Sequence, residues 1–269
     1  MAETSANFGI EVGEQSVGGF VAYIAQFDPQ FPQRIQGATD EEINALEETV
    51  RRPLPDDYKD FLRHLGNGCD RLVFAGECYT DVFSVSESYK GLYADLDAGL
   101  LEGLSAEETP LPPKGCLVIG APCVSSDVVC LDLRGEGTAP VVVMDNGKPV
   151  FYSASLLHLL YYQGFIHYRL PVLPQLKFFT DYGQTPATRD SFERAITWAS
   201  TAPWSPQWFS DTTCLCVEGD GVAFCLTFFE QIGYTLLIGG AAGHDIEETM
   251  QAISQVIGVT LKDTPLDPE

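Results

Sequence analysis

The sequence predicts an α+β fold: N-terminal helices, an antiparallel sheet of about six strands, a closing helix, and then a small α+β C-terminal unit. Apolar residues recur at helical spacing up to about residue 65, whereas from residue 71 their period shortens toward two. The pair Asn146-Gly147 separates two strand-like runs, as a two-residue hairpin turn requires. Helices followed by a run of strands, rather than regular alternation of the two, are typical of the α+β class.

Two patterns predict the first helices. Over residues 16–27, apolar side chains recur on one helical face behind Ser16, a suitable N-cap. A second helix begins at Thr39, which has capping-box spacing to Glu42, and acidic residues fill its first turn, where the helix dipole favours them. The apolar stripe of this second helix consists of Ile43, Leu46 and Val50.

A third helix follows the proline-containing turn at residues 53–55. Asp56 and Asp57 are expected to cap it, and this role explains the two adjacent carboxylates better than acid–base catalysis does. Gly66-Asn67-Gly68 should end the helix with residues that tolerate positive φ. The apolar face of this third helix consists of Tyr58, Phe61, Leu62 and Leu65.

Short strands are expected from residue 71 onward, followed by a closing helix over residues 153–164 with Ser153 as its N-cap. The last two strands flank the Asn146-Gly147 turn and should form a hairpin. The predicted strands cover residues 71–75, 78–83, 116–121, 128–133, 140–144 and 148–152.

The stretch Leu170-Pro171-Val172-Leu173-Pro174 is typical of a linker and divides the chain into two units. The first covers residues 1–168. The second, residues 175–269, is expected to be a small α+β domain or an extension packed on the first, with a tight turn at Gly219-Asp220-Gly221. Its predicted helices cover residues 189–200 and 245–257, and its predicted strands cover residues 213–217, 222–229 and 234–238.

Charge limits the classes of partner. The chain has 15 Lys+Arg and 38 Asp+Glu residues, a formal net charge of -23. Phosphate groups attract basic surfaces, so this charge disfavours nucleic acid and an anionic membrane surface, and it favours a basic protein partner. No apolar run approaches the about 20 residues of a membrane-spanning helix, and the N-terminus has no signal-peptide pattern, so a cytoplasmic location is expected.

Motifs for catalysis and cofactor binding are missing from the sequence. His-Glu-x-x-His, Gly-x-Ser-x-Gly and Gly-Lys-Ser/Thr do not occur, and the glycines of residues 239–243 lack dinucleotide-binding spacing. Neither an active site nor a cofactor is therefore expected. The cysteines are expected to be buried free thiols. Cys214 and Cys216 share one strand face, but without a second pair they do not predict a metal site.

Residues 87–108 predict a partner-binding surface. This segment contains many acidic residues but a single basic residue, Lys90, and tyrosines and leucines are interleaved with the acidic residues. Apolar anchors among acidic residues suit the recognition of a basic protein. An amphipathic segment that covers the sheet would show the same pattern, and both interpretations can hold for one segment. The candidate contact residues are Glu87, Tyr89, Tyr93, Asp95, Asp97, Glu102, Glu107 and Glu108.

A series of features spans about residues 35–165. An acidic-capped helix at residues 38–43, the Leu54-Pro55 turn, an aromatic-rich second helix and a terminal Asn67-Gly68 occur in this order, and strands and a closing helix follow. This series resembles the SUKH superfamily (Smi/Knr-like). The helix at residues 16–27 and the part after residue 170 lie outside the resemblance.

The resemblance implies a domain that binds rather than catalyses, in which Tyr58, Phe61, Leu62 and Gly68 have structural roles. Bacterial members of the superfamily block toxins by direct binding, through contacts that the shared signature does not fix. We therefore expect an immunity protein that occludes a cognate, basic toxin domain. A scaffold or regulatory adaptor without a toxin partner is the alternative, and an enzyme hidden in the C-terminal unit is a third hypothesis.

Overall fold

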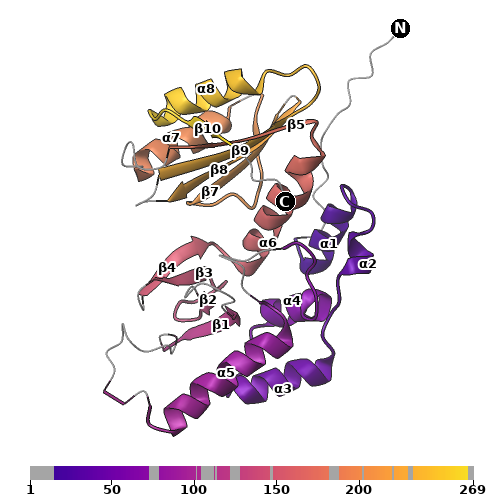
Figure 1. Cartoon of the computed structure of the whole chain (residues 1–269), viewed down its shortest axis with the longest axis vertical. Helices are drawn as coiled ribbons and strands as arrows, with labels where there is room; N and C mark the ends of the chain where they lie inside the picture. The colour runs from indigo at the N-terminus through magenta and orange to yellow at the C-terminus, as the bar shows by residue number, and fades with distance from the viewer. Residues whose placement is uncertain are drawn as a thin grey trace.

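The structure, a computed structural model, combines helices with two antiparallel sheets, which confirms the predicted α+β class. Helices α1–α5 come first, then a four-stranded sheet, α6, and a six-stranded sheet with two further helices (Figure 1). None of the helices in the described part of the chain is both long and apolar enough to cross a membrane. The structure describes residues 15–72, 79–100, 102–103, 112, 114–121, 128–145, 148–181, 188–201, 203–219, 221–229 and 233–265.

The first helices begin where the sequence predicts. In α1 (Val17–Ala25) the Ser16 hydroxyl accepts a hydrogen bond from the Gly19 N–H at 3.0 Å. A short helix, α2 (Phe31–Arg34), follows within the segment between the predicted helices. In α3 (Asp40–Val50) both bonds of the predicted capping box are present, so the sequence signal is confirmed at atomic level.

Helix α4 (Asp56–Leu65) ends differently from the expectation. Gly66 has a φ of -70°, and positive φ is not found at Gly66, Asn67 or Gly68, so the predicted left-handed cap is wrong. These residues instead lie against residues 36–38: the Gln36 N–H donates to the Gly68 carbonyl at 3.0 Å. A Cβ on Gly66 would lie 3.0 Å from the Ala38 Cβ. The glycine is therefore needed for close approach rather than for a special backbone conformation.

Residues 79–83 do not form the strand predicted for residues 78–83, and residue 78 lies outside the described part of the chain. Tyr79 makes an isolated bridge to Ala121, and helix α5 (Val82–Asp97) begins directly afterwards. The Asp81 carboxylate accepts a hydrogen bond from the Ser84 N–H at 2.8 Å and caps this helix. The first predicted strand is also not observed at residues 71–72, and residues 73–75 lie outside the described part.

The first sheet has the order β1-β2-β3-β4 and four strands among the described residues, not six. Asp145 pairs with Lys148 across residues 146–147, which confirms the predicted hairpin strands; the turn itself lies outside the described residues. The strands are β1 (Cys116–Gly120), β2 (Val129–Asp132), β3 (Val141–Asp145) and β4 (Lys148–Ser153).

Helix α6 (Leu156–Gly164) is capped by Ser155 instead of the expected Ser153, because the Ser155 hydroxyl is the group that accepts from the His158 N–H. A π-helical turn (Phe165–Arg169) and a 3-10 turn (Leu170–Val172) continue it. Leu170 in the predicted linker is fully buried. One residue of this segment is therefore part of the core, and a division of the chain at this point stays a prediction.

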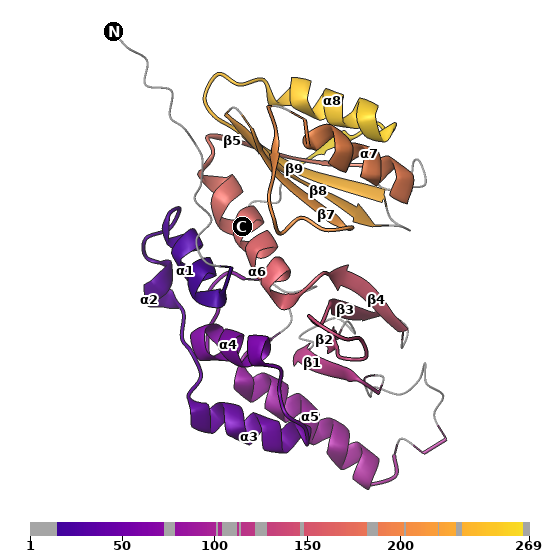
Figure 2. The ribbon, with the colours of Figure 1, turned by 180° about the vertical axis from the view of Figure 1, so that it is seen from behind.

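The second sheet has the order β10-β5-β9-β8-β7-β6, and helices α7 and α8 cover one of its faces (Figures 1 and 2). The sequence predicted β7, β8, β9 and both helices but not the edge strands or β5. The elements are β5 (Gln175–Thr180), α7 (Arg189–Ala199), β6 (Ser205–Pro206), β7 (Cys214–Gly219), β8 (Val222–Phe229), β9 (Gly233–Gly240), α8 (Ile246–Ile257) and β10 (Lys262–Thr264).

The opposite face of the second sheet packs on the N-terminal part. One hydrophobic core contains residues of α1–α6 and the first sheet together with Phe209 and several residues of β7 and β8. Tyr161 of α6 lies at its centre, with ring centroids 5.4 Å from Phe20 and 5.6 Å from Phe209. A second core fills the space between the sheet and helices α7 and α8. The two sheets thus share apolar contacts through α6.

Candidate protein-binding surface

The base of α5 is fixed to the core by its buried face. Val82, Val85 and Tyr89 are spaced for one side of a helix, and all three are buried. The Tyr89 hydroxyl accepts a hydrogen bond from the Val118 N–H at 2.8 Å, which ties the helix to β1. Because its side chain is 4% exposed, Tyr89 positions the helix and is not available to a partner.

Beyond Tyr89 the helix leaves the body of the protein. Residues 94–98 are all exposed, and the ribbon shows the last turns of α5 extending past the sheet (Figure 1). We call residues 93–100, 102 and 103 the α5 tip. Tyr93 connects the base of the tip to α3: its hydroxyl donates to the Val50 carbonyl at 3.0 Å, and the Arg51 guanidinium lies 4.2 Å from the ring centroid.

The helix ends in a Schellman motif. Gly99 has a φ of +71°, its N–H donates to the Leu96 carbonyl, and the Leu100 N–H donates to the Asp95 carbonyl, each at 3.0 Å. In this motif the last residue commonly packs against an apolar side chain three positions before the cap. Asp95 occupies that position here, so Leu100 has no such contact and is 68% exposed. Leu96 is 44% exposed beside it.

The acidic residues of the tip differ in their pairing. The Arg51 guanidinium lies 3.7 Å from the Asp97 carboxylate, an exposed ion pair that contributes little energy. Asp95 and Glu102 have no ion pair with a described residue. The exposed leucines are thus bordered by carboxylates that are free to meet cations on another protein.

The structure brings together only part of the predicted contact set. Tyr93, Asp95, Asp97 and Glu102 all belong to the α5 tip. Glu87 lies further toward the start of the helix and pairs with Lys90 at 2.8 Å, and Tyr89 is buried. Glu107 and Glu108 lie outside the described residues.

Sequence reasoning missed further exposed apolar side chains. Phe83, 71% exposed at the start of α5, lies in one of the predicted strands. Val150 and Phe151, 49% and 39% exposed, lie on β4 at the edge of the first sheet. An apolar run in a predicted strand indicates burial on at least one side, so only the three-dimensional arrangement could reveal their exposure.

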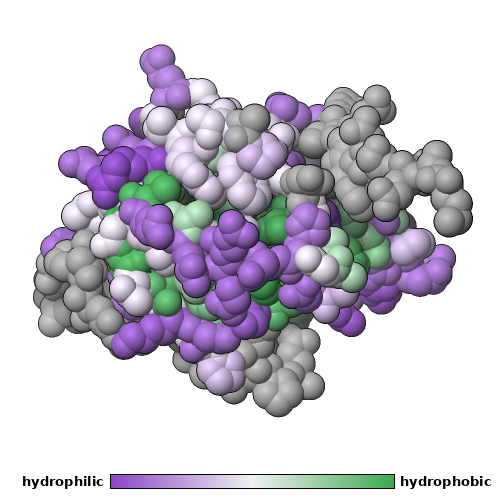
Figure 3. Space-filling model, turned by 90° about the horizontal axis from the view of Figure 1, so that it is seen from above, coloured by the Kyte–Doolittle hydropathy of each residue, from purple (hydrophilic) through white to green (hydrophobic). Residues whose placement is uncertain are grey.

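Hydrophilic side chains dominate the face above the second sheet (Figure 3). The first turn of α8 contributes Glu247 and Glu248, and α7 begins with Asp190. The negative charge of the chain is therefore not confined to α5. It gives the protein a broad negative field rather than one acidic patch.

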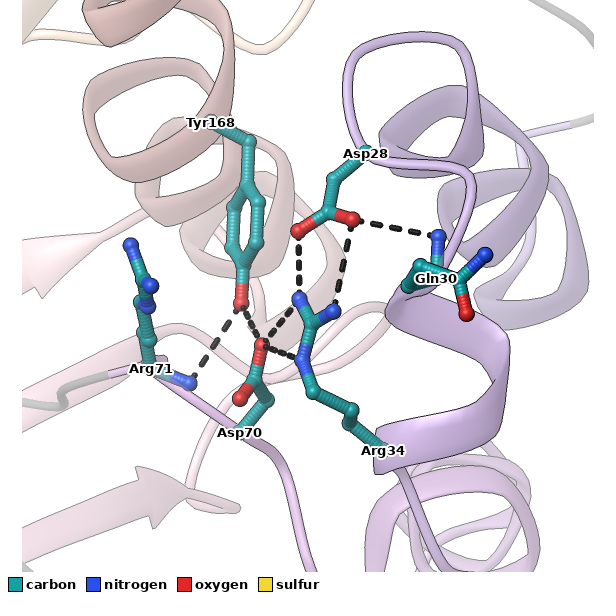
Figure 4. Close-up of polar contacts among 6 residues, drawn as sticks. All are labelled: Asp28, Gln30, Arg34, Asp70, Arg71 and Tyr168. Atoms are coloured by element: carbon teal, nitrogen blue, oxygen red, sulfur yellow. Dashed lines mark hydrogen bonds and ion pairs between the residues drawn. The ribbon is translucent and has the colours of Figure 1, made fainter.

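A separate polar network fixes the N-terminal helices (Figure 4). The Arg34 guanidinium bridges the carboxylates of Asp28 and Asp70, with a contact of 2.8 Å to Asp70. The Tyr168 hydroxyl donates to Asp70 at 2.7 Å and accepts from the Arg71 N–H at 3.3 Å. The network joins the α1–α2 connection, the turn after α4 and the extension of α6, and we assign it a structural role.

This network predicts an acid-sensitive contribution to stability. Hydrogen bonds from Arg34 lower the pKa of Asp28, and for Asp70 hydrogen bonds from Arg34 and Tyr168 outweigh burial and lower the pKa as well. A carboxylate whose pKa is lowered in the folded state stabilises the protein at pH values above its unfolded pKa of about 3.9. This stabilisation is lost as the pH falls through the folded pKa. The unfolding free-energy difference between wild type and Arg34→Met should therefore be constant from about pH 7 to 5 and shrink below about pH 4.

Urea unfolding over this pH range measures that difference. Arg189→Met is the matched control, because Arg189 is exposed and has no ion pair with a described residue. A difference for Arg34→Met that stays constant down to pH 2 would show that the network does not stabilise the fold through its charges.

Groups that could bind a metal ion are found elsewhere. Among the described residues, one group of His, Cys or acidic side chains lies close enough together to bind a metal ion, namely Cys214, Cys216 and Cys225. Their ligand atoms lie within 4.8 Å of one another, and all three side chains are buried. This cluster lies in the second sheet, away from the α5 tip.

Comparison with protein families matches residues 37–160 to the model described as SMI1 / KNR4 family (SUKH-1). The match contains α3 to α5, the first sheet and most of α6, and it confirms the resemblance predicted for about residues 35–165. A comparison with curated proteins finds no match. The α5 tip lies inside the matched region, whereas the second sheet lies outside it.

Proposed function

Because residues 37–160 belong to the SMI1 / KNR4 family (SUKH-1), we propose that this chain is an immunity protein that binds a cognate bacterial toxin and occludes its active site or substrate surface. The family includes such proteins. The proposal places both molecules in the cytoplasm, where the complex would form before the toxin can act. No chemistry by the chain itself is required.

The observation that carries the proposal is the α5 tip. It presents Leu96 and Leu100 to solvent on a protruding helix end, next to the carboxylates of Asp95 and Glu102. Buried apolar anchors supply most of the binding energy in protein complexes, and charges at the rim raise the association rate and select the partner. The net charge of -23 adds long-range attraction for a basic toxin domain.

A co-expression assay tests the proposal directly. We expect cells that produce the toxin encoded beside this chain to survive only when the chain is also present. In vitro, the association rate of the purified pair should fall as salt is raised, because salt screens the exposed charges. If the chain gives no protection and does not bind that toxin, the immunity proposal is wrong and an adaptor role takes its place.

One matched pair of variants tests the surface. Leu100→Lys places a cation at the centre of the α5 tip and should weaken toxin binding about 30-fold or more, which corresponds to the loss of a hot-spot contact. Val172→Lys is the control, because Val172 is also exposed, at 52%, but lies on the extension of α6. Protection with an unchanged Kd for Leu100→Lys would place the toxin on another surface.

A further inference from the structure

Three cysteine thiols meet on the second sheet, on the face that packs against α6. Cys214 and Cys216 lie on β7, and Cys225 lies on β8. The Sγ atoms of Cys214 and Cys216 are 3.8 Å apart, and those of Cys216 and Cys225 are 3.6 Å apart. All three side chains are at most 6% exposed.

Strand register brings the thiols together. Cys216 is paired with Cys225, and the Thr213 carbonyl accepts from the Phe228 N–H at 2.8 Å. Hydrogen-bonded and non-hydrogen-bonded pairs alternate along antiparallel strands, so Cys216 and Cys225 form a non-hydrogen-bonded pair, in which side chains approach most closely. The Cys216 N–H accordingly points away from β8, to the Ser210 hydroxyl at 2.9 Å.

The geometry points to a binding site for a soft, thiophilic metal ion, and we propose that Cys214, Cys216 and Cys225 bind one Cu(I) ion through three sulfur ligands. Metal–sulfur bonds of about 2.3 Å place the sulfurs of a trigonal site about 4 Å apart, close to the separations in the cluster. Thiolates select Cu(I) and Zn(II) among the common ions. The three thiols lose protons to solvent on binding, and no electron is transferred.

The number of ligands favours Cu(I) over Zn(II). Structural zinc sites in proteins are almost always four-coordinate, with Cys, His, Asp or Glu as ligands. In the described part of the chain, no fourth residue of these types joins the three thiols. The Thr227 hydroxyl is hydrogen-bonded to the Cys225 sulfur at 3.7 Å. Hydrogen bonds of this kind stabilise thiolates from the second shell of a metal site.

The test measures Cu(I) binding to the full-length chain. Because the thiols are buried, the reduced protein is unfolded and refolded without oxygen in the presence of Cu(I) buffered by the chromophoric chelator bicinchoninate. We expect one Cu(I) per chain, taken from the chelator, and X-ray absorption showing three sulfur neighbours. Binding of fewer than three sulfurs, or no withdrawal of copper from the chelator, would overturn the proposal.

Variants identify the ligands. Cys216→Ser removes the central thiol and should weaken Cu(I) binding at least 100-fold, whereas Thr227→Val should weaken it about 10-fold. Cys130→Ser is the matched control, since Cys130 is equally buried but lies on β2, and it should bind like wild type. Equal binding by Cys216→Ser and wild type would overturn the site, and tighter binding of Zn(II) than of Cu(I) in the same titration would overturn the three-coordinate assignment.

Discussion

Arg169→Leu is expected to lower the free energy of unfolding by about 3–5 kcal/mol at neutral pH. The Arg169 guanidinium lies 2.7 Å from the Glu218 carboxylate, and the two side chains are only 9% and 10% exposed. Arg169 ends the π-helical turn after α6 and Glu218 belongs to β7, so the pair joins the extension of α6 to the second sheet. Removing the cation leaves a buried carboxylate without a partner, and this cost exceeds the value of the pair itself.

The pH dependence of this loss identifies its cause. Burial raises the pKa of Glu218 despite the adjacent Arg169, and removal of Arg169 should raise it further. A carboxyl group whose folded pKa exceeds its unfolded value favours folding at low pH, and this advantage disappears as pH rises through the folded pKa. Urea unfolding should therefore show a smaller loss for Arg169→Leu at pH 5 than at pH 7.

Two further variants complete this experiment. Glu218→Leu combined with Arg169→Leu should recover much of the stability, because no unpaired charge then stays buried. Lys90→Leu breaks the exposed pair with Glu87 and should change stability by about 0.5 kcal/mol or less. A loss for Arg169→Leu as small as that of Lys90→Leu would mean that water reaches Glu218 in the folded protein.

Local chemistry explains which elements the sequence could predict. The capping box of Thr39 and Glu42 lies within one helical turn, so its residues identify the start of α3 without tertiary information. The strands on either side of residues 146–147 are similarly defined by a two-residue turn and by alternating apolar residues. Both predictions are confirmed because the signal and the structure involve the same few residues.

The start of α5 shows where local patterns fail. Residues 78–83 contain β-branched and aromatic side chains, which favour a strand, but the Asp81 cap and the burial of Val82 and Val85 favour a helix. Tertiary packing decided between them. The same packing buried Tyr89, so the sequence identified the proposed binding segment on α5 but not which of its side chains face solvent.

The thiol cluster could have been predicted more fully. The predicted strands on either side of residues 220–221 pair Gly219 with Val222, and counting back from this pair places Cys216 opposite Cys225. Sequence spacing alone does not reveal the cluster, because Cys225 stands apart from the other two cysteines. Strand register brings residues that are distant in the sequence together in one site. The register is set by the number of residues between the strands, which can be read from the sequence.

Phe209→Ala is expected to destabilise the whole chain by about 3–5 kcal/mol, because Phe209 is fully buried and belongs to the core of the N-terminal part although it lies after residue 200. Trp198 and Trp204 pack on the second core, whereas Trp208 contacts Tyr161 of α6, so tryptophan fluorescence reports the second unit together with its contact with α6. Far-UV circular dichroism is dominated by the helices. In wild type and Phe209→Ala, both signals should give one coincident urea transition.

Phe192→Ala, in the second core, should shift both signals too if the shared contacts make unfolding cooperative. If Phe192→Ala shifts the fluorescence transition but not the dichroism transition, the chain consists of two independent units divided near residue 170. The reason is that a cavity in one domain does not destabilise a separate domain.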